Sequence, residues 1–197
     1  MNQLIIVAHP KKDSFSKTIS EELKSRFLNE SYSVKIRDLY QIEFNPLLTA
    51  KELKINKTGD IYPDIIEEQR MMAWADEITF IYPLWWNAFP AVLKGYIDRV
   101  FTNGFAFRIG EKGPEGLLGG KRVRLITTAG MSDEALKKSN IYEGLRITQE
   151  HGVFEFCDME VVMHEFIPRV TALTEEEKQE VLDGLIQKIF DKKEVDA

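Results

Sequence analysis

Short apolar runs without internal alternation are the feature of this sequence that most restricts its fold. Leu4 to Ala8, Ile78 to Tyr82 and Val123 to Thr128 carry apolar side chains at consecutive positions. Neighbouring side chains of a strand point to opposite faces of a sheet, so such runs are typical of parallel strands covered on both faces. The three runs are therefore predicted to be central strands of an α/β sheet.

Two further strands and four helices complete the predicted fold. Val34 to Leu39 alternates apolar and polar residues, as a strand nearer an edge does, and Val161 to Met163 is the candidate for a fifth strand. Apolar residues recur at helical spacing in Ser16 to Leu28, Pro63 to Ala75, Ala88 to Val100 and Thr174 to Phe190. A sixth strand is hard to find. The pattern predicts an α/β protein with a flavodoxin-like, doubly wound, five-stranded parallel sheet, helices on both faces and strand order 2-1-3-4-5.

Composition narrows the class of protein. A chain of 197 residues suits one domain, expected to span residues 1–197, and its net charge of −6 argues against nucleic acid as the main partner. No apolar run approaches the length of a membrane span, so no direct membrane insertion is expected. The start Met1-Asn2-Gln3 carries no charged leader, which favours a cytoplasmic protein. With Cys157 as the single cysteine and three scattered histidines, no disulfide and no metal site are predicted.

Two long connections interrupt the regular alternation of strands and helices. They span Gln41 to Tyr62 and the glycine-rich segment from Thr102 to Lys121. Loops of this length in compact domains are more often functional than idle. The last residues, Asp191 to Ala197, are expected to form a frayed, solvated tail.

A polar turn follows the first predicted strand and leads into the first predicted helix. The free amides and the positive dipole end of a helix N-terminus favour an anion there. Ser14 and Ser16 add hydroxyl donors, and His9 can donate through a ring nitrogen. The cost of bringing a phosphate close is lowered by three lysines, Lys11, Lys12 and Lys17. The Walker and G-x-G-x-x-G patterns are absent, which argues against ATP, GTP and a Rossmann-bound dinucleotide. The alternative is that a serine merely caps the helix.

Two consecutive tryptophans, Trp85 and Trp86, stand where the third predicted strand passes into a helix. In an open α/β sheet the carboxyl ends of the strands are where ligands bind, so these indoles could wall a flat cofactor. Indoles are equally common in cores and subunit interfaces. The pair alone does not decide between these interpretations.

A small-residue turn, Thr127-Thr128-Ala129-Gly130-Met131, follows the fourth predicted strand. Such a turn lets backbone amides approach the edge of a planar ring, although by itself it is typical of an ordinary tight connection. In a 2-1-3-4-5 sheet the ends of strands one, three and four are neighbours. The three segments are therefore predicted to line one pocket.

Together these segments resemble a known enzyme family. The motifs are Ala8-His9-Pro10 with Ser14-Phe15-Ser16, Pro83-Leu84-Trp85-Trp86 with Pro90-Ala91-Val92-Leu93-Lys94-Gly95 and Asp98-Arg99-Val100-Phe101, Gly104-Phe105-Ala106-Phe107, and Thr127-Thr128-Ala129-Gly130. They are similar to the flavodoxin-like NAD(P)H:quinone oxidoreductases, which include the mammalian quinone reductase, bacterial quinone reductases and the ancillary oxidoreductases of potassium-efflux systems. The resemblance runs from about Leu4 to Phe166, and the block from Pro83 to Phe101 is its most specific part.

The resemblance implies a flavin enzyme. Hydride would pass from NADH or NADPH to the flavin, and a quinone or related acceptor would then take two electrons in a ping-pong cycle. It also implies a homodimer in which the neighbouring subunit completes the pocket. The alternatives are a regulatory flavoprotein subunit of a potassium-efflux-type transporter and, ranked lower, an electron-carrier flavodoxin, which needs no wide double-tryptophan pocket.

The resemblance assigns roles to individual residues. The flavin phosphate side is implied to contact His9, Ser14, Phe15 and Ser16. The isoalloxazine ring is implied to pack on and hydrogen-bond Pro83, Leu84, Trp85, Trp86 and Asn87, with its pyrimidine edge near Thr127, Thr128, Ala129, Gly130 and Met131. The substrate pocket is expected to be edged by Phe105 and Phe107, which could equally belong to the dimer seam.

Two departures from the family pattern limit what can be carried over. The animal quinone reductase has two adjacent glycines where this chain has Ala129-Gly130, and a tyrosine and a histidine shortly downstream that assist proton movement. Here the candidate catalytic residues are Tyr142 and His151, which are differently spaced and could instead be surface helix positions. The chain is also shorter than the animal enzyme. Because three lysines are available for a terminal phosphate, FMN is favoured over FAD.

Overall fold

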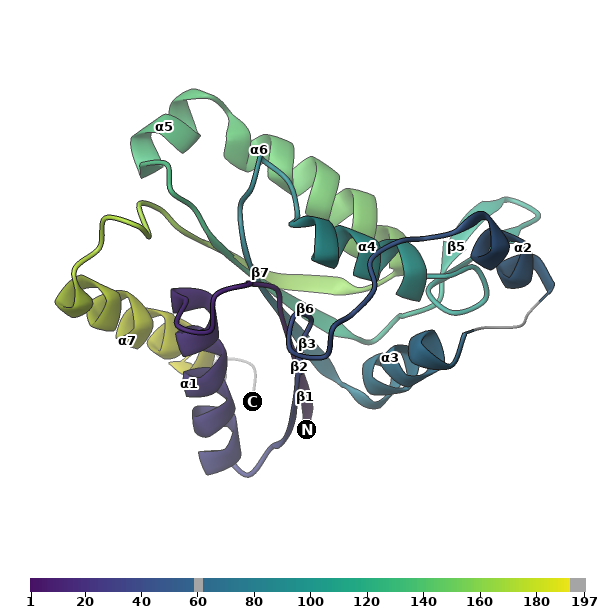
Figure 1. Cartoon of the computed structure of the whole chain (residues 1–197), viewed down its shortest axis with the longest axis horizontal. Helices are drawn as coiled ribbons and strands as arrows, with labels where there is room; N and C mark the ends of the chain where they lie inside the picture. The colour runs from purple at the N-terminus through teal and green to yellow at the C-terminus, as the bar shows by residue number, and fades with distance from the viewer. Residues whose placement is uncertain (59–61, 192–197) are drawn as a thin grey trace.

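The protein is described by a computed structural model that covers residues 1–58 and 62–191. Its centre is a five-stranded parallel sheet in the order β2-β1-β3-β6-β7 (Figure 1). The strands are β1 (Asn2–Val7), β2 (Ser33–Asp38), β3 (Glu77–Pro83), β6 (Arg122–Thr128) and β7 (Glu160–Ile167). Counted over these strands alone the order is 2-1-3-4-5, so the predicted fold is confirmed.

Helices cover both faces of this sheet (Figure 1). One face is covered by α1 (Phe15–Asn29) and α7 (Glu175–Asp191), and the other by α3 (Pro63–Trp74), α4 (Ala91–Val100) and the helical segment after β6. A capping box opens α7, because Glu177 N donates to Thr174 Oγ1 at 3.1 Å and Thr174 N donates to Glu177 Oε2 at 2.7 Å. The third predicted helix begins at Ala91 rather than Ala88, because Pro90 has extended backbone and caps it.

The buried strands feed two separate cores, which explains their unbroken apolar runs. Leu4 and Ile6 belong to the cluster under α3 and α4, whereas Ile5 and Val7 belong to the cluster under α1 and α7. All four side chains are buried. A strand with apolar contacts on both faces has no position left for polar alternation.

The first long connection holds a helix that the sequence pattern does not predict, α2 (Ala50–Thr58). A buried ion pair between Glu52 Oε1 and Arg99 Nε, 2.6 Å apart, ties α2 to α4. Close approach of this connection also requires Gly95, since a Cβ there would lie 2.2 Å from the carbonyl oxygen of Pro46. These anchors join residues far apart in sequence, so local periodicity does not reveal them. Residues 59–61 of the connection lie outside the described ranges.

The second long connection folds into an antiparallel hairpin of β4 (Phe107–Gly110) and β5 (Gly113–Gly116), separate from the main sheet. It reaches toward α2 at one end of the molecule (Figure 1). The two long connections therefore meet on one side of the fold rather than forming independent loops.

A run of short helical pieces joins β6 to β7, where no helix was predicted. They are α5 (Asp133–Lys138), α6 (Ile141–Leu145), a nine-residue π-helix η1 (Arg146–Phe154) and a 3₁₀ turn η2 (Glu155–Cys157). Asn140, with φ of 52°, ends the first piece. π-helical geometry is rare and often marks functional sites.

The predicted solvated tail lies outside the described residues from position 192 onward. Within residues 1–58 and 62–191, no helix combines the length and apolar character needed to cross a membrane.

Candidate functional site

A pocket of about 520 Å³ opens where the carboxyl ends of the strands meet. The structure brings together residues from all three predicted segments: His9, Pro83, Leu84, Trp85, Trp86, Asn87, Thr128, Ala129, Gly130 and Met131. Two further lining residues, Val170 and Thr171, were missed. They follow β7, whose predicted end at Met163 falls four residues before the observed end at Ile167. The rule that ligands bind at strand ends would have found them had that strand been drawn to its full length.

Backbone hydrogen bonds fix the turns around the pocket. Leu84 N donates to Thr128 O at 2.7 Å, which joins the wall after β3 to the wall after β6. Ala129 N donates to Ile167 O at 2.8 Å, and Ala129 O accepts from Val170 N at 2.9 Å. The amide of Ala129 is thus already engaged and does not serve as a free donor to a ring, contrary to the expectation from the sequence. Gly130 and Met131, the next two residues of this turn, also line the pocket.

The tryptophans form a tight turn at the mouth of the pocket. Ala88 N donates to Trp85 O at 3.0 Å, and Trp86 and Asn87 between them have φ of 52° and 55°. Two consecutive positive φ values define a type I′ turn, and left-handed backbone at a bulky residue costs about 1–3 kcal/mol. Trp86 is 99% exposed and Trp85 is 41% exposed. The core-filling interpretation of this pair is therefore wrong.

The turn after β1 has a donor that is not used within the described chain. Ser14 is the N-cap of α1, but its side chain makes no capping hydrogen bond, and its buried Oγ has no hydrogen-bond partner among the described residues. A buried hydroxyl without a partner is costly. In the first turn of α1, Lys17 N and Thr18 N donate to Ser14 O, which leaves the amides of Phe15 and Ser16 for a ligand. This arrangement fits a phosphate better than it fits a simple side-chain cap.

His9 presents a defined donor to the same pocket. Lys11 N donates to His9 Nδ1 at 3.1 Å, so the neutral imidazole carries its proton on Nε2. Burial lowers the pKa of His9, which favours this neutral form. Its ring lies 6.1 Å from that of Trp85, centroid to centroid.

One of the three lysines expected near the phosphate is engaged elsewhere. Lys17 Nζ lies 2.7 Å from Asp38 Oδ2, and both side chains are largely buried. The pair ties α1 to the end of β2, which no local pattern indicates. Lys11 and Lys12 are exposed, so they remain available to an anion.

The other residues of the first turn take two different places. Ser16 Oγ lies 3.4 Å from Thr128 Oγ1, so it reaches the pocket wall. Phe15 lines a separate recess of about 140 Å³ between α1 and α7, which also contains Asp13, Glu175 and Lys178. The side chain of Thr127 is fully buried beneath the pocket and does not line it.

The candidate catalytic residues Tyr142 and His151 do not line the pocket. The Tyr142 hydroxyl donates to Asp133 Oδ1 at 2.8 Å, and burial together with this carboxylate raises the pKa of Tyr142 to about 12. His151 is exposed on η1 and pairs with Glu155 one turn away, which raises the pKa of His151. In a single chain both are positions on the helical cover of the sheet.

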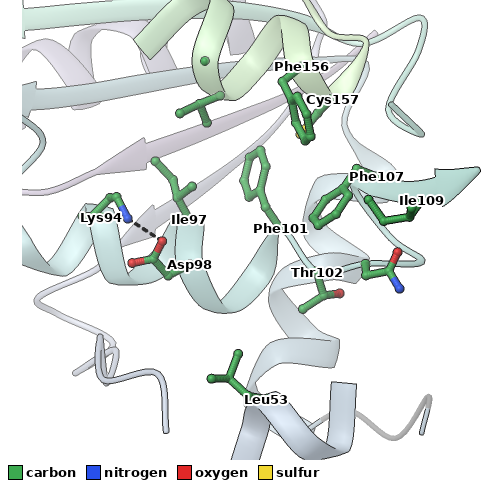
Figure 2. A pocket seen from close by; sticks show the side chains of 13 residues that line it. Leu53, Lys94, Ile97, Asp98, Phe101, Thr102, Phe107, Ile109, Phe156 and Cys157 are labelled. Atoms are coloured by element: carbon green, nitrogen blue, oxygen red, sulfur yellow. Dashed lines mark hydrogen bonds and ion pairs between the residues drawn. The ribbon is translucent and has the colours of Figure 1, made fainter. Parts of the chain in front are cut away.

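A second, apolar cavity of about 610 Å³ lies between α4, η2 and the hairpin (Figure 2). Figure 2 shows Phe101, Phe107 and Phe156 pointing into it, with Lys94 and Asp98 paired at its edge. Phe107 therefore lines this cavity and not the first pocket, while Phe105 packs against the core. The two cavities share no lining residue.

Cysteine and metal chemistry gain no support from the geometry. Cys157 is buried beside the second cavity, and burial raises the pKa of its thiol to about 11. In the part of the chain that the structure describes, no group of three His, Cys, Asp or Glu side chains could hold a metal ion.

A buried polar chain beneath the pocket was also missed by the sequence. It runs through Gln149, Tyr82, Thr127, His164 and Glu150. Its members come from η1, β3, β6 and β7, so only the assembled sheet brings them together.

The fold and the site define a class of protein: a doubly wound α/β protein that can hold a flat, phosphate-bearing cofactor at the switch point of its sheet. Residues 1–190 match the family described as having a flavodoxin-like fold, and the chain belongs to this family.

Known proteins resemble the chain along nearly its whole length. An uncharacterized NAD(P)H oxidoreductase of Haemophilus influenzae is 34% identical over 189 residues, covering 95% of this chain and 94% of the relative. The mouse ribosyldihydronicotinamide dehydrogenase [quinone] is 29% identical and covers 94% of this chain and 89% of its own. The crystal structure of a putative quinone reductase from Klebsiella pneumoniae superposes with a TM-score of 0.88 at 27% identity, covering 96% of this chain and 83% of that one.

Proposed function

We propose that this protein is a flavin-dependent NAD(P)H oxidoreductase that reduces quinones or related acceptors by two-electron transfer. The observation that carries the proposal is the meeting of three strand ends in one pocket with an indole wall, while the turn that carries His9 also holds a buried hydroxyl without a partner among the described residues, that of Ser14. The names of the relatives support the same class of reaction. When bound, the flavin would accept a hydride from NADH or NADPH and pass two electrons to the acceptor in a ping-pong cycle.

The turn after β1 is proposed to hold the phosphate. Ser14 Oγ, Ser16 Oγ, the first amides of α1 and Nε2–H of His9 are the donors that this turn offers. Since donors of this kind satisfy phosphate oxygens without a metal, Lys11 and Lys12 need only add long-range attraction.

FMN is the proposed flavin, with FAD as the alternative. Beyond the phosphate turn lies the recess of about 140 Å³ between α1 and α7, far smaller than the main pocket of about 520 Å³. That recess also contains the carboxylates of Asp13 and Glu175, which would face the second phosphate of a dinucleotide unfavourably. Both features favour FMN, which ends at its phosphate, over FAD, which continues beyond it.

The wall after β3 and the turn after β6 are proposed to orient the ring. Leu84, Trp85 and Trp86 present apolar surface that excludes water from the reacting face, while Asn87 offers an amide for hydrogen bonding. Gly130 and Met131 line the opposite side with backbone amides, which stabilise negative charge where it develops.

A homodimer is proposed to complete the substrate pocket. Ile109 is 70% exposed, Leu53 53% and Phe156 42%, and all three line the apolar cavity of Figure 2. Exposed apolar surface next to a groove is typical of an interface. If a second copy covers the tryptophan turn with this surface, Phe107 of one chain would edge the acceptor site of the other, as the sequence prediction requires.

Smaller parts of the proposal concern proton handling and location. Tyr142 and His151 are retained as candidate proton donors only, since a partner subunit or substrate would have to approach them. A cytoplasmic location is proposed because that compartment supplies reduced nicotinamides. No feature of the described residues calls for a transporter partner.

Anaerobic reduction tests the proposal directly. The purified protein is loaded with FMN or FAD, mixed with NADH or NADPH, and followed by flavin absorbance. We expect bleaching in one two-electron step and recovery on adding a quinone. Slow reduction by both nicotinamides, with no recovery, would point to a carrier or regulatory flavoprotein; failure to bind either flavin would refute the proposal.

A further inference from the structure

A buried hydrogen-bond chain ties the two walls of the pocket to η1. The Tyr82 hydroxyl donates to Gln149 Oε1 at 2.6 Å, and the hydroxyl of Thr127 lies 3.2 Å from His164 Nε2. Tyr82 and Thr127 are register partners of β3 and β6, so their side chains lie next to each other on one face of the sheet. Each of these side chains is almost entirely buried. The chain is therefore a connected polar unit inside the core.

This unit lies one residue away from the pocket on both walls. Tyr82 precedes Pro83, and Thr127 precedes Thr128, so each hydroxyl belongs to the strand position directly before a lining residue. Consecutive side chains of a strand point to opposite faces. The unit thus touches the pocket through the backbone and through charge, rather than by direct contact.

His164 is the titratable member of the unit. Its Nδ1 lies 2.8 Å from Glu150 Oε1, and its ring stacks on Phe166 with centroids 4.1 Å apart. With Glu150 accepting from Nδ1–H, the neutral ring accepts at Nε2 from Thr127. A second proton would place N–H groups on both nitrogens and reverse that bond, so that Thr127 accepts from His164 and becomes free to donate toward Tyr82.

Opposing effects act on the pKa of His164, and the net effect is a lowering. Burial lowers the pKa of His164, Glu150 acts in the opposite direction, and Arg146 on η1 adds to the lowering. At the rim, Lys188 of α7 pairs with Glu165 of β7 at 2.6 Å, and the ring of Tyr142 of α6 packs edge-on against Phe166. A cleft of about 480 Å³ lined by these charged residues connects the His164 edge with solvent. A proton can therefore reach His164 without entering the flavin pocket.

We propose that His164 and Glu150 form a redox-linked proton-binding pair: His164 takes up a proton when the flavin in the pocket is reduced and releases it when the flavin is reoxidised. The inference rests on the proposed function. It makes His164 a positioning residue, because it acts on the pocket through Thr127 and through its charge.

The proton balance of the reaction gives this pair a task. Reduction of a quinone by NAD(P)H consumes one hydride and one proton. The hydride enters the pocket with two electrons and leaves one added negative charge there until the acceptor removes it. His164 holds one solvent proton during that interval. When the quinone takes the hydride and a separate proton from solvent, His164 returns its own proton to solvent.

Nuclear magnetic resonance of the three histidines tests the proposal on the unmodified protein. The ring Cε1–H signals of His9, His151 and His164 are titrated in the FMN complex before and after reduction by dithionite. We expect the titration midpoint of His164 to rise by about one pH unit on reduction, the size that a unit charge at roughly 10 Å produces in a protein interior. An unchanged midpoint, or a shift confined to His151, would overturn the proposal.

Proton uptake measured with an indicator dye gives a second readout. On reduction, wild-type protein should take up as much as one proton more per flavin than H164Q does. This difference should appear only at pH values between the His164 midpoints of the oxidised and the reduced protein. E150Q should move that window to lower pH, because it removes the carboxylate that favours the charged ring. E155Q is the matched comparison for E150Q, since it removes a carboxylate that pairs with a histidine on the surface. Equal uptake by wild type and H164Q contradicts the inference.

Dithionite reduces the flavin whether or not NAD(P)H does, so the two proposals can fail separately. A protein that binds FMN and shows the His164 shift but ignores both nicotinamides refutes only the proposed function. A protein that binds no flavin refutes both. If H164Q does not fold, the wild-type titration still decides the inference.

Discussion

Ser16 Oγ lies 3.4 Å from Thr128 Oγ1, a contact that joins the first turn of α1 to the carboxyl end of β6 across 112 positions of sequence. Both side chains are buried. The contact connects the side of the pocket proposed to bind phosphate with the side proposed to bind the ring edge. A rigid link between the two would hold them at the fixed separation that one cofactor requires.

Removing this contact should weaken flavin binding more than it weakens the fold. We expect Thr128→Val, which keeps the shape and loses the hydroxyl, to reduce FMN affinity roughly two- to tenfold, the range of one hydrogen bond. Fluorescence titration of apoprotein with FMN measures the loss. Ser16→Ala and the double variant complete a cycle, and additive losses would show that the two hydroxyls act independently.

Ser14→Ala should separate stability from cofactor affinity. Its hydroxyl is buried without a partner among the described residues, so its removal should leave the free energy of unfolding of the apoprotein unchanged or raise it by about 1 kcal/mol. Affinity for FMN should fall, whereas affinity for riboflavin, which lacks the phosphate, should stay the same. Ser20→Ala is the control, because Ser20 Oγ already donates to Lys17 O at 2.8 Å. Equal loss for both ligands would place the phosphate elsewhere.

Trp86→Gly should stabilise the apoprotein and destabilise the FMN-bound protein. Glycine adopts the φ of 52° without strain, and the exposed indole contributes no burial, so we expect a gain of about 1 kcal/mol in unfolding free energy without flavin. Thermal unfolding with and without FMN measures both effects. Asn87→Gly, at the next turn position, should give a smaller gain because asparagine tolerates this backbone. A destabilised apoprotein would mean that the indole has contacts in solution that offset the strain.

The order of the sheet and the convergence of three strand ends could be predicted because both depend on local patterns and a general rule of doubly wound folds. Leu4 to Ala8 and Ile78 to Tyr82 show two-sided burial directly in their composition. The convergence of three segments on one pocket follows from strand order, and the family resemblance assigns the individual residues. Val170 and Thr171, which also line the pocket, could not be predicted in this way.

The remaining features depend on long-range contacts that no window of sequence reports. Lys17 is a plausible phosphate ligand until Asp38 is found beside it, and Ala129 offers a free amide until Ile167 accepts from it. His164 carries no motif at all, and only the pairing of β6 with β7 brings it to Thr127. Predicting these contacts requires the register between the strands, above all between β6 and β7. The final strand was predicted to end at Met163, which is too short to give that register.

A buried ion pair at the amino end of the sheet should matter for stability and not for binding. Glu77 Oε1 lies 2.6 Å from Arg124 Nη2, and Gln3 donates to the other carboxylate oxygen at 2.8 Å. Glu77→Gln leaves the guanidinium buried without its partner, so we expect a loss of about 3–5 kcal/mol in chemical unfolding. FMN affinity of the folded fraction should be unchanged, since the pocket is at the opposite strand ends. Replacing both members, Glu77→Leu with Arg124→Met, should recover much of the loss.

Stability of the apoprotein should decline as the pH falls below about 6.5. Burial lowers the pKa of His164 and of His9 in the folded protein, so the unfolded chain binds protons more tightly there. The decline begins at the unfolded value and ends once the pH passes the folded values. Urea unfolding from pH 7.5 to 5 measures it, and H164Q should flatten the slope. A slope identical in H164Q would assign the decline to other groups.

The separation of the two cavities allows the two halves of the proposed reaction to evolve independently. The cofactor pocket is built from strand ends, which the sheet holds in fixed register, whereas the apolar cavity is built largely from α4, the second long connection and the helical segment of η1 and η2. Insertions or substitutions in the long connections can reshape the surface offered to an acceptor without moving a strand end. Relatives that share this sheet can therefore keep one redox chemistry while diverging in the molecules they reduce.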